Sequence, residues 1–548
     1  MKGITKMKTL SAAVLFLALT LTVLSQNNWV NTFNSGGTNP DDANYHAIDN
    51  QGNTYVTGYS APGGYPDGVL VKVSPSGNTV WSKYFYGYNG GNAIGRKILI
   101  DQNNNIFVFS EGESFGNSND FFLHKFDSNG NLLISVRHGD PAYNETFGDA
   151  IFDNSGNIVV AISGRTPVDT LYRTIMLRYD KNCMPLGYGT CEPYGGNNYP
   201  GKLIKDLSGN IFVIGSILYR FQQDHALVVI LKLNTQFQQI ASSSISAPLN
   251  SITFFCAAES MLNTDIIVCA SYPASNGEKN MKIQKLNNNL TIIWDRDYNI
   301  VNGQSEFYTD MKIDNYSNIY LSGYSNSNGD ADAITVKLDI DGNMIWNKVY
   351  DRSGNYDEAR KIAVDGMGNV YTGGMSSSNS SNFDAMILKY NAAGVLQFEY
   401  NYNGQAFSTD LFSFITVTSS GIITASGRTT NLVNNVHNSD IFTVRLDAVF
   451  TGTGTISSEI PSEFSLSQNY PNPFNPSTTI GFNIPSNSKV NLVVFNSAGQ
   501  QVAELVNENL NAGTYEYKFD AGKLTSGVYF YRLTTDNFTE TKKMILVK

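Results

Sequence analysis

Few residues of this chain have the type and spacing that catalysis requires. The run Gly112-Glu-Ser-Phe-Gly116 matches the nucleophile-elbow pattern, which needs a strand, a sharp turn and a helix. Here a polar segment and another strand-like run follow, so we interpret the match as coincidental. The histidines lie in different parts of the chain and lack the spacing of a zinc site. They are His46, His124, His138, His225 and His437. We therefore predict no catalytic residue.

One acidic run is similar to a calcium-binding loop. Asp339-Ile-Asp-Gly-Asn343 supplies several oxygens close together, but the full loop needs more oxygens and a distal Glu. We interpret this run as a hairpin turn, with Ca²⁺ binding as the alternative. The sequence predicts no resident metal or cofactor.

The four cysteines fall into two local pairs. Cys256 and Cys269 flank a predicted hairpin with a turn near residue 263, so they are expected to lie opposite one another. Cys183 and Cys191 form the other pair. Four cysteines allow three pairings, and we favour the two local disulfides. A metal site is the alternative, although the chain has no CxxC motif.

The composition narrows the class of protein. Among 548 residues, 15% are charged and 12% are aromatic, with 48 Gly, 31 Tyr and 31 Phe. A disordered chain would be richer in charge and poorer in aromatics. The formal net charge of −10 argues against nucleic acid, whose partners present a clustered basic face. The composition indicates an all-β protein.

The first 25 residues have the pattern of a secretory signal peptide. Three lysines are followed by an uncharged, mostly apolar stretch over residues 10–24 and by Ser25. The stretch is shorter than the roughly 20 residues of a membrane span. We expect cleavage before Gln26, and no membrane-spanning segment elsewhere.

A unit of about 53 residues repeats eight times over residues 26–450. Each copy has an apolar strand with one basic residue, and these basic residues are separated by 53, 53, 54, 53, 52, 52 and 56 positions. They are Lys72, Lys125, Arg178, Lys232, Lys285, Lys337, Lys389 and Arg445. An Asp-x-x-Gly-Asn turn precedes this strand, and a second tight turn follows it. Each unit therefore predicts four antiparallel strands.

Eight such units bury one another when they are arranged as an eight-bladed β-propeller. The last unit lacks a fourth strand, and residues 28–34 offer one, so we predict that the N-terminal strand closes the ring. An Asp precedes most of the repeated basic residues by five positions, at Asp67, Asp120, Asp332, Asp384 and Asp440. We favour a structural ion-pair or hydrogen-bond role for these charges over a ligand-binding ring.

The repeat resembles the SBBP-type bacterial β-propeller repeat. The similarity lies in the order Asp-x-x-Gly-Asn-x-Tyr-Val-Thr-Gly, Asp-Ala-x-x-x-Lys-Leu and Gly-Asn-x-x-Trp, and it covers most of residues 40–446. That family is usually described as seven-bladed, whereas eight copies are counted in this chain.

A linker over residues 451–462 leads to a second domain at residues 463–548. Its alternating apolar and polar runs predict a small Ig-like β-sandwich. The segment resembles the type IX (Por) secretion C-terminal sorting domain of Bacteroidetes-like bacteria. The motifs are Tyr470-Pro-Asn-Pro-Phe-Asn475, Leu524-x-Ser-Gly-Val-Tyr-Phe-Tyr531 and the closing run Lys542-Lys-Met-Ile-Leu-Val-Lys548. The resemblance implies handling by the type IX machinery and delivery outside the cell or to its surface, and the sorting signal would include Pro471, Asn472, Pro473, Phe474, Lys542, Lys543 and Lys548.

The loops after the fourth strands are the predicted ligand-facing surface, because the repeat places them all on one face. They carry Tyr86, Tyr88, Asn89, Tyr194, Asn197, Tyr298, Tyr350, Tyr356 and Tyr402. Tyr and Asn on Gly-rich loops suit glycan or protein binding, and packing of each Tyr against the next blade is the alternative. We predict a non-catalytic exported protein that binds protein or carbohydrate at the cell surface. A secreted enzyme acting on glycans and a passive surface scaffold are the alternatives.

Overall fold

The computed structural model describes most of the chain from residue 28 onward. The described residues are 28–36, 40–113, 118–139, 143–165, 171–191, 196–218, 225–248, 255–259, 265–273, 278–301, 303–327, 330–352, 354–379, 382–404, 409–419, 421–433, 436–446, 454–457, 463–469, 472–485, 488–510, 513–522, 524–535 and 537–548. The predicted signal peptide lies outside these residues. The only helical element among them is the short 3₁₀ turn η1 (Tyr88–Gly90).

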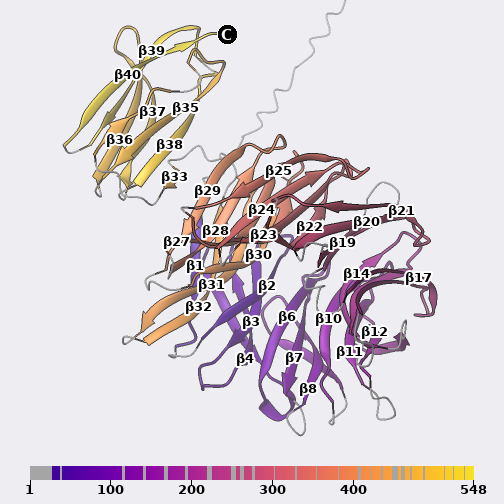
Figure 1. The fold of residues 1–548 in the computed structure, drawn as a ribbon. Helices are drawn as coiled ribbons and strands as arrows, with labels where there is room; N and C mark the ends of the chain where they lie inside the picture. Colours follow the sequence, from indigo (N-terminus) through magenta and orange to yellow (C-terminus); the bar gives the residue numbers. More distant parts are fainter. Residues whose placement is uncertain are drawn as a thin grey trace, which may run out of the picture.

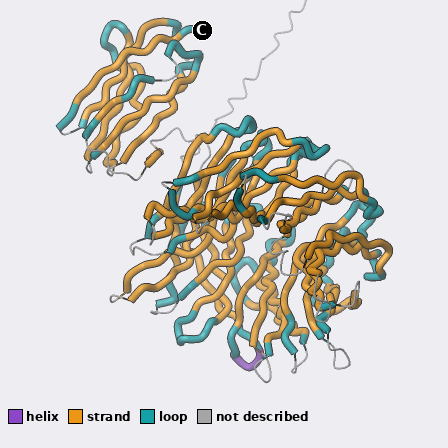
Figure 2. Tube along the Cα trace, viewed as in Figure 1, coloured by secondary structure: helices purple, strands orange, loops and turns teal. Residues whose placement is uncertain are grey.

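Eight four-stranded antiparallel sheets occupy the described part of residues 29–446, and they are arranged radially as in a β-propeller (Figures 1 and 2). Seven of them are formed by consecutive strands. The first three sheets are β2 (Asp42–Ile48), β3 (Thr54–Ser60), β4 (Asp67–Val73), β5 (Thr79–Phe85); β6 (Ala93–Ile100), β7 (Ile106–Glu113), β8 (Asn119–Phe126), β9 (Leu132–His138); and β10 (Thr146–Phe152), β11 (Ile158–Gly164), β12 (Arg173–Tyr179), β13 (Pro185–Cys191). The fourth and fifth sheets are β14 (Asn197–Lys205), β15 (Ile211–Leu218), β16 (His225–Leu233), β17 (Gln239–Pro248); and β18 (Phe255–Glu259), β19 (Ile266–Pro273), β20 (Lys279–Leu286), β21 (Ile292–Tyr298). The sixth and seventh sheets are β22 (Ser305–Ile313), β23 (Ile319–Ser327), β24 (Asp330–Leu338), β25 (Met344–Tyr350); and β26 (Asp357–Val364), β27 (Val370–Asn379), β28 (Asn382–Tyr390), β29 (Leu396–Tyr402).

The eighth sheet joins the two ends of the propeller. Its strands are β30 (Leu411–Val417), β31 (Ile423–Val433), β32 (Val436–Leu446) and β1 (Trp29–Phe33). Trp29 lies opposite Arg445, and Phe33 lies opposite Ile441. The predicted closure by the N-terminal strand is therefore confirmed.

The predicted Asp turns are hairpins stabilised by their own side chains. In the first sheet, Asp49 Oδ1 accepts the backbone N–H of Gln51 and Asn53 at 2.9 Å, and Asp49 Oδ2 accepts Asn53 Nδ2 at 2.8 Å. Gly52 takes a φ of 82°, which a residue with a side chain rarely adopts. Asp339 repeats the pattern, because it accepts the N–H groups of Asp341 and Asn343. The carboxylate of this run therefore stabilises a hairpin, as predicted.

The repeated basic residues tie each sheet to the next one. Lys72 Nζ lies 5.2 Å from the centre of the Tyr55 ring in its own sheet and donates to the carbonyl of Ser128, 3.0 Å away in the following sheet. Four other pairs repeat this bond to a turn carbonyl of the next sheet: Lys125 to Lys181, Arg178 to Thr235, Lys232 to Asn288 and Lys337 to Ala392. The predicted structural role is confirmed for these residues.

Tryptophan makes a second bond of the same kind. Trp346 Nε1 donates to the carbonyl of Ala392 at 3.1 Å, and Trp294 Nε1 donates to that of Ile340 at 3.2 Å. Across the closure, Trp29 Nε1 donates to the carbonyl of Pro75 at 2.9 Å. The contact between the chain ends thus copies the contact between consecutive sheets.

The predicted disulfide between Cys183 and Cys191 is wrong. Both thiols are free and buried. Cys183 lies in the hairpin turn before β13, and Cys191 ends that strand. A strand of this length keeps their Cα atoms about 20 Å apart, far beyond the roughly 7 Å limit for a disulfide.

The second cysteine pair has the predicted register. Cys256 on β18 lies directly opposite Cys269 on β19. The side chain of Cys256 lies outside the described residues, so this disulfide stays a prediction.

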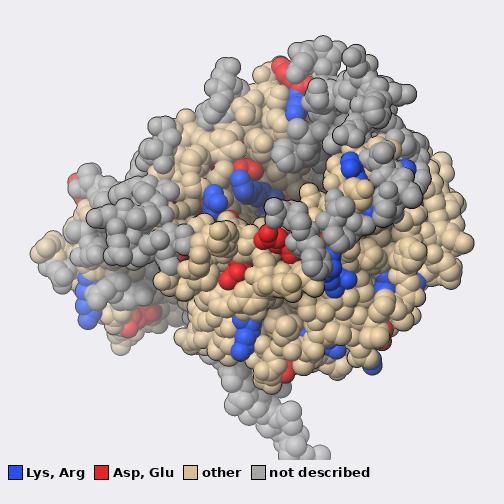
Figure 3. Space-filling model, turned by 90° about the horizontal axis from the view of Figure 1, so that it is seen from below, with Lys and Arg blue, Asp and Glu red and all other residues tan. Residues whose placement is uncertain are grey.

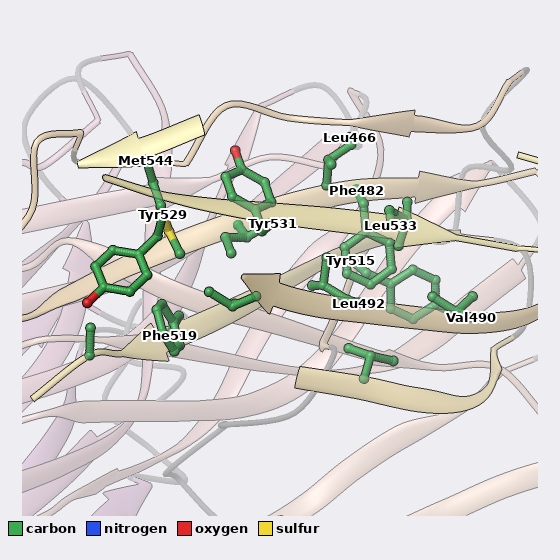
Figure 4. Packing of buried hydrophobic residues seen from close by; sticks show 14 of the residues in the cluster. Leu466, Phe482, Val490, Leu492, Tyr515, Phe519, Tyr529, Tyr531, Leu533 and Met544 are labelled. Atoms are coloured by element: carbon green, nitrogen blue, oxygen red, sulfur yellow. The ribbon is translucent and has the colours of Figure 1, made fainter. Parts of the chain in front are cut away.

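The C-terminal unit is a β-sandwich of two four-stranded sheets. One sheet consists of β33 (Gly454–Ser457), β38 (Gly513–Asp520), β35 (Ser477–Ile484) and β34 (Ser465–Leu466), and the other of β37 (Gln501–Leu510), β36 (Ser488–Asn496), β39 (Gly527–Thr534) and β40 (Thr539–Leu546). Strand β33 comes from the segment predicted as a linker. Figure 4 shows the core, where Phe482 and Tyr515 from one sheet pack with Leu492 and Leu533 from the other.

The closure contact can be compared directly with an internal one. In Trp29→Phe and Trp346→Phe, each variant loses one indole N–H bond to a turn carbonyl and keeps an aromatic ring. We expect both to lower the unfolding free energy by about 1 kcal/mol. The measurement is urea unfolding followed by tryptophan fluorescence and circular dichroism. If Trp346→Phe lowered the unfolding free energy and Trp29→Phe did not, the closing contact would not be energetically equivalent to the internal contact.

Candidate functional site

The loops after the fourth strands are fastened by buried carboxylates. Glu306, at the start of β22, accepts the N–H groups of Ile300 and Val301. Asp357, at the start of β26, accepts the N–H of Arg352 at 2.6 Å. Asp41 and Asp410 repeat the arrangement in the β1–β2 and β29–β30 connections. All four are fully buried, so these loops are held to the sheets that follow them.

Several of the aspartates five positions before the repeated basic residues also hold this face together. Asp384 forms an ion pair with Arg352 at 2.7 Å, and Asp120 forms one with Arg137. Asp440 accepts Asn34 Nδ2 at 2.6 Å. These carboxylates therefore make stabilising contacts on the loop side of the propeller, while the repeated basic residues connect neighbouring sheets on the turn side.

The predicted ligand-facing residues divide into exposed and packed groups. Tyr86 and Tyr88 are exposed, with Arg137 lying 5.3 Å from the centre of the Tyr88 ring. Asn89, in the same turn, has a φ of 53°. Tyr194 lies outside the described residues.

The remaining predicted loop residues make intramolecular contacts. Asn197 Oδ1 accepts the N–H of Tyr172, and the hydroxyl of Tyr298 donates to the carbonyl of Gly342 in the next sheet. Tyr350 packs at the edge of a hydrophobic cluster, and Tyr402 stacks on Phe442 with ring centres 4.9 Å apart. Packing against neighbouring sheets is thus the role of Tyr298 and Tyr402.

Tyr356 belongs to a row of aromatic rings that sequence reasoning missed. The ring centres of Phe307 and Tyr324 are 4.9 Å apart, and those of Tyr324 and Tyr356 are 6.2 Å apart. We call Phe307, Tyr324 and Tyr356 the aromatic row. All three side chains are half-buried. The available signal was the repeated Gly-Tyr pair at the end of the second strand, as in Gly323-Tyr324.

Charged groups border the aromatic row. Lys279 Nζ lies 4.9 Å from the centre of the Phe307 ring. Glu358 accepts Arg360 Nη2 at 3.1 Å and the Tyr356 hydroxyl at 3.3 Å. Burial raises the pKa of Asp42, and Arg428 and Arg360 act against that rise. Because Phe307 lies on β22 and Tyr356 directly precedes β26, and both are innermost strands of their sheets, the row lies beside the centre of the propeller. Figure 3 shows basic and acidic side chains gathered around a hollow in one face of the molecule.

Two of the described histidines lie between hydroxyl groups of neighbouring strands. His46 is buried between the hydroxyls of Ser426 and Thr416, and burial lowers its pKa to about 3. His124 lies between Ser110 and Ser135 in the same way. The side chains of His225 and His437 lie outside the described residues. No group of three or more potential metal ligands occurs in the part of the chain that the structure describes. Of the Gly112–Gly116 pattern, Gly112 lies in β7, and the remaining residues beyond Glu113 are not described.

The predicted sorting-signal residues come together in the C-terminal sandwich. Asn472 Oδ1 accepts the N–H of Ile545 at 2.9 Å, and the buried Phe474 bonds the last strand through its backbone. Lys542 forms an ion pair with Glu540, Lys543 is exposed, and Lys548 Nζ donates to the carbonyl of Gly522. Pro473 follows Asn472 through a cis peptide bond, and Pro471 lies outside the described residues. The proline-rich entry segment and the closing strand are therefore adjacent.

Comparison with solved structures returns propellers and other large folds at low similarity. PorZ, a bacterial surface component of the type-IX secretion system of Porphyromonas gingivalis, is 14% identical with a TM-score of 0.39, over 94% of this chain and 60% of that one. The chain thus spans about 60% of the PorZ structure. An ulvan lyase of polysaccharide lyase family PL25 is 12% identical with a TM-score of 0.40, over 62% of this chain and 90% of that one. Drosophila Plexin A is 9% identical with a TM-score of 0.36, over 78% and 88%. At these values the similarities assign no function.

The buried loop carboxylates predict a specific pH dependence of stability. Burial raises the pKa of Glu306 to about 7 and that of Asp357 to about 7. A raised pKa in the folded state adds stability at low pH, and this contribution is lost as the pH rises from about 4.5 through 7. Glu306→Gln keeps a neutral acceptor at every pH and so avoids this loss. Its stability relative to the parent, measured as the difference in unfolding free energy, should therefore be about 2 kcal/mol greater at pH 8 than at pH 5.

The control for this measurement is the exposed Glu463, changed to Gln in the same way. Urea unfolding at both pH values gives the comparison. An equal pH dependence of Glu306→Gln and the parent would contradict the predicted protonation of Glu306.

The sequence comparison identifies one part of the chain. No curated protein matches the chain. Within the described residues, the structure contains no helix with the length and apolarity needed to cross a membrane. Residues 468–548 match the family model described as the secretion system C-terminal sorting domain. The C-terminal sandwich is therefore a type IX secretion sorting domain, and the protein that carries it is exported to the cell surface or beyond it.

Proposed function

We propose that this protein is an exported, non-catalytic β-propeller that binds carbohydrate at the loop face of the ring. The observation that carries the proposal is the aromatic row with its charged border. Half-exposed aromatic rings supply apolar contact to the faces of sugar rings, and the adjacent Lys279 and Arg360 supply hydrogen bonds to hydroxyl groups.

The surroundings of the row favour binding without large rearrangement. Asp357 holds the backbone of the loop that carries Tyr356, and Glu306 holds the loop before Phe307. A surface that is already ordered loses little conformational entropy when a ligand binds. This preorganisation suits a protein that must recognise a ligand outside the cell.

The buried carboxylates weigh against a glycan-cleaving enzyme as the main function. A raised pKa is typical of a general acid. However, Glu306 and Asp357 are fully buried and accept backbone N–H groups of the loops. A ligand on the aromatic row would therefore meet the loop surface and not these carboxyl groups.

A glycan array probed with the full chain tests the proposal, followed by calorimetry on the best ligand. Tyr324→Ala and Tyr356→Ala should each weaken binding at least tenfold, because each removes one ring of the row. The matched control is Tyr188→Ala, since Tyr188 is 76% exposed on a different sheet. Binding should be unaffected there.

Two results would contradict this function. Equal loss in Tyr188→Ala would show that the aromatic row is not the binding surface. Release of shorter oligosaccharides from the bound glycan, detected by mass spectrometry and lost in Glu306→Gln, would instead indicate an enzyme.

A further inference from the structure

The innermost strands of the ring share one irregularity. Seven of them contain a register shift at the same place, four to six residues before the following turn. A bulge of this kind changes the direction of the side chains around it. The residues directly after the shift, in ring order, are Tyr45, Lys97, Asp149, Lys202, Asp310, Lys361 and Phe414. We call them the central ring.

Residues of the central ring interact across the propeller. The ring centres of Tyr45 and Phe414 are 4.1 Å apart, and Lys97 Nζ lies 5.9 Å from the centre of the Tyr45 ring. Asp149, Lys202 and Asp310 all act on the ionisation of Tyr45. Side chains from widely separated sheets therefore converge at the centre.

One carboxylate of the central ring is fully satisfied. Asp149 forms a close ion pair with Lys97 and accepts the N–H groups of Ala150 and Leu203, both at 2.9 Å. Burial acts to raise the pKa of Asp149, but the ammonium groups of Lys97 and Lys202 outweigh it and lower that pKa. Lys97 and Asp149 thus neutralise one another.

The other carboxylate of the central ring, that of Asp310, has more than one ammonium group near it, and its single negative charge cannot neutralise them all. Asp310 lies 3.9 Å from Lys312 and accepts the N–H of Ile362 at 3.2 Å. Lys361 and Lys202 also act on its ionisation. In the described part of the chain, the ammonium groups of Lys202 and Lys361 make no hydrogen bond or ion pair, although both residues are paired in the sheets through their backbone. The three lysines and two aspartates of the central ring leave a net charge of about +1, in a protein whose overall charge is −10.

A pocket lies next to this region, on the turn side of the ring. It has a volume of about 270 Å³ and lies between the ends of β22 and β26, where Lys312, Tyr316, Val364 and Asp365 line it. Lys312 connects the cavity to Asp310 through their ion pair.

We propose that Lys202 and Lys361 bind an oxyanion, a sulfate or a carboxylate, in the centre of the propeller. Partly buried ammonium groups that form no direct ion pair are stabilised by a bound anion, and charge-assisted hydrogen bonds to its oxygens are strong. The Tyr45 hydroxyl is a further donor in the same ring. This site is distinct from the aromatic row, and it does not depend on carbohydrate binding there.

Calorimetry on the full chain tests the site, with sodium sulfate and sodium glucuronate as probes and sodium chloride at equal ionic strength as the reference. At least one probe should bind with one ion per chain, and the stronger probe identifies the source of the oxyanion. Lys202→Gln combined with Lys361→Gln should weaken that binding at least tenfold. Lys181→Gln, an exposed lysine in the β12–β13 turn, is the matched control and should bind normally.

Asp310→Asn gives an independent readout that misfolding cannot imitate. Removing the competing carboxylate should tighten anion binding several-fold, while the circular dichroism spectrum stays that of the parent. The proposal is overturned if neither probe binds better than chloride, if the double lysine variant binds like the parent, or if Asp310→Asn binds no more tightly.

Discussion

The propeller depends on hydrogen bonds from each sheet to the turn of the next one. A four-stranded sheet exposes two faces, and neither can be buried within a single repeat. The repeated Lys or Arg and the outer-strand Trp both donate to carbonyls of the following hairpin, as Lys337 and Trp346 do to Ala392. These bonds need a turn of fixed shape, and the Asp or Asn at the start of the turn provides it by accepting the N–H groups of the residues two and four positions later, as Asp127 and Asn391 do. The turn sequence therefore fixes both the hairpin and the position of the neighbouring sheet.

The two faces of the ring use carboxylates differently. On the turn side, Asp49, Asp314 and Asp365 shape hairpins and accept the hydroxyls of Tyr55, Tyr320 and Tyr371. On the loop side, Glu306 and Asp357 are buried beneath the connections and hold their backbone. The Asp turns on the turn side thus recur with nearly the same sequence. The loops on the other side differ in sequence, but buried carboxylates hold their backbone to the sheets. Such a division is typical of proteins whose binding residues lie on loops positioned by a rigid scaffold.

The repeat, the closing strand and the sorting domain were predictable from the sequence because each depends on local patterns. Turn residues recur at fixed spacing, and the missing fourth strand after Arg445 matched the unassigned Trp29 strand. The Cys183–Cys191 disulfide was wrongly predicted because two residues close in sequence lie far apart in space when an extended strand separates them, as β13 does here. The central ring was missed because a bulge breaks the alternation from which side-chain direction is inferred. The aromatic row was missed because its rings come from two different sheets, and only the folded ring brings Tyr324 and Tyr356 together.

The sheet shared by the two chain ends also has a consequence for biogenesis. Asn31 and Thr443 are neighbours in the finished molecule, yet nearly the whole propeller separates them in the order of synthesis. Until the final repeat has been made and translocated, Trp29–Phe33 has no partner, and an unpaired β32 would present an open edge to other chains. Closure of the ring is therefore the last step in forming the propeller, and the edge of β32 is open until that step is complete.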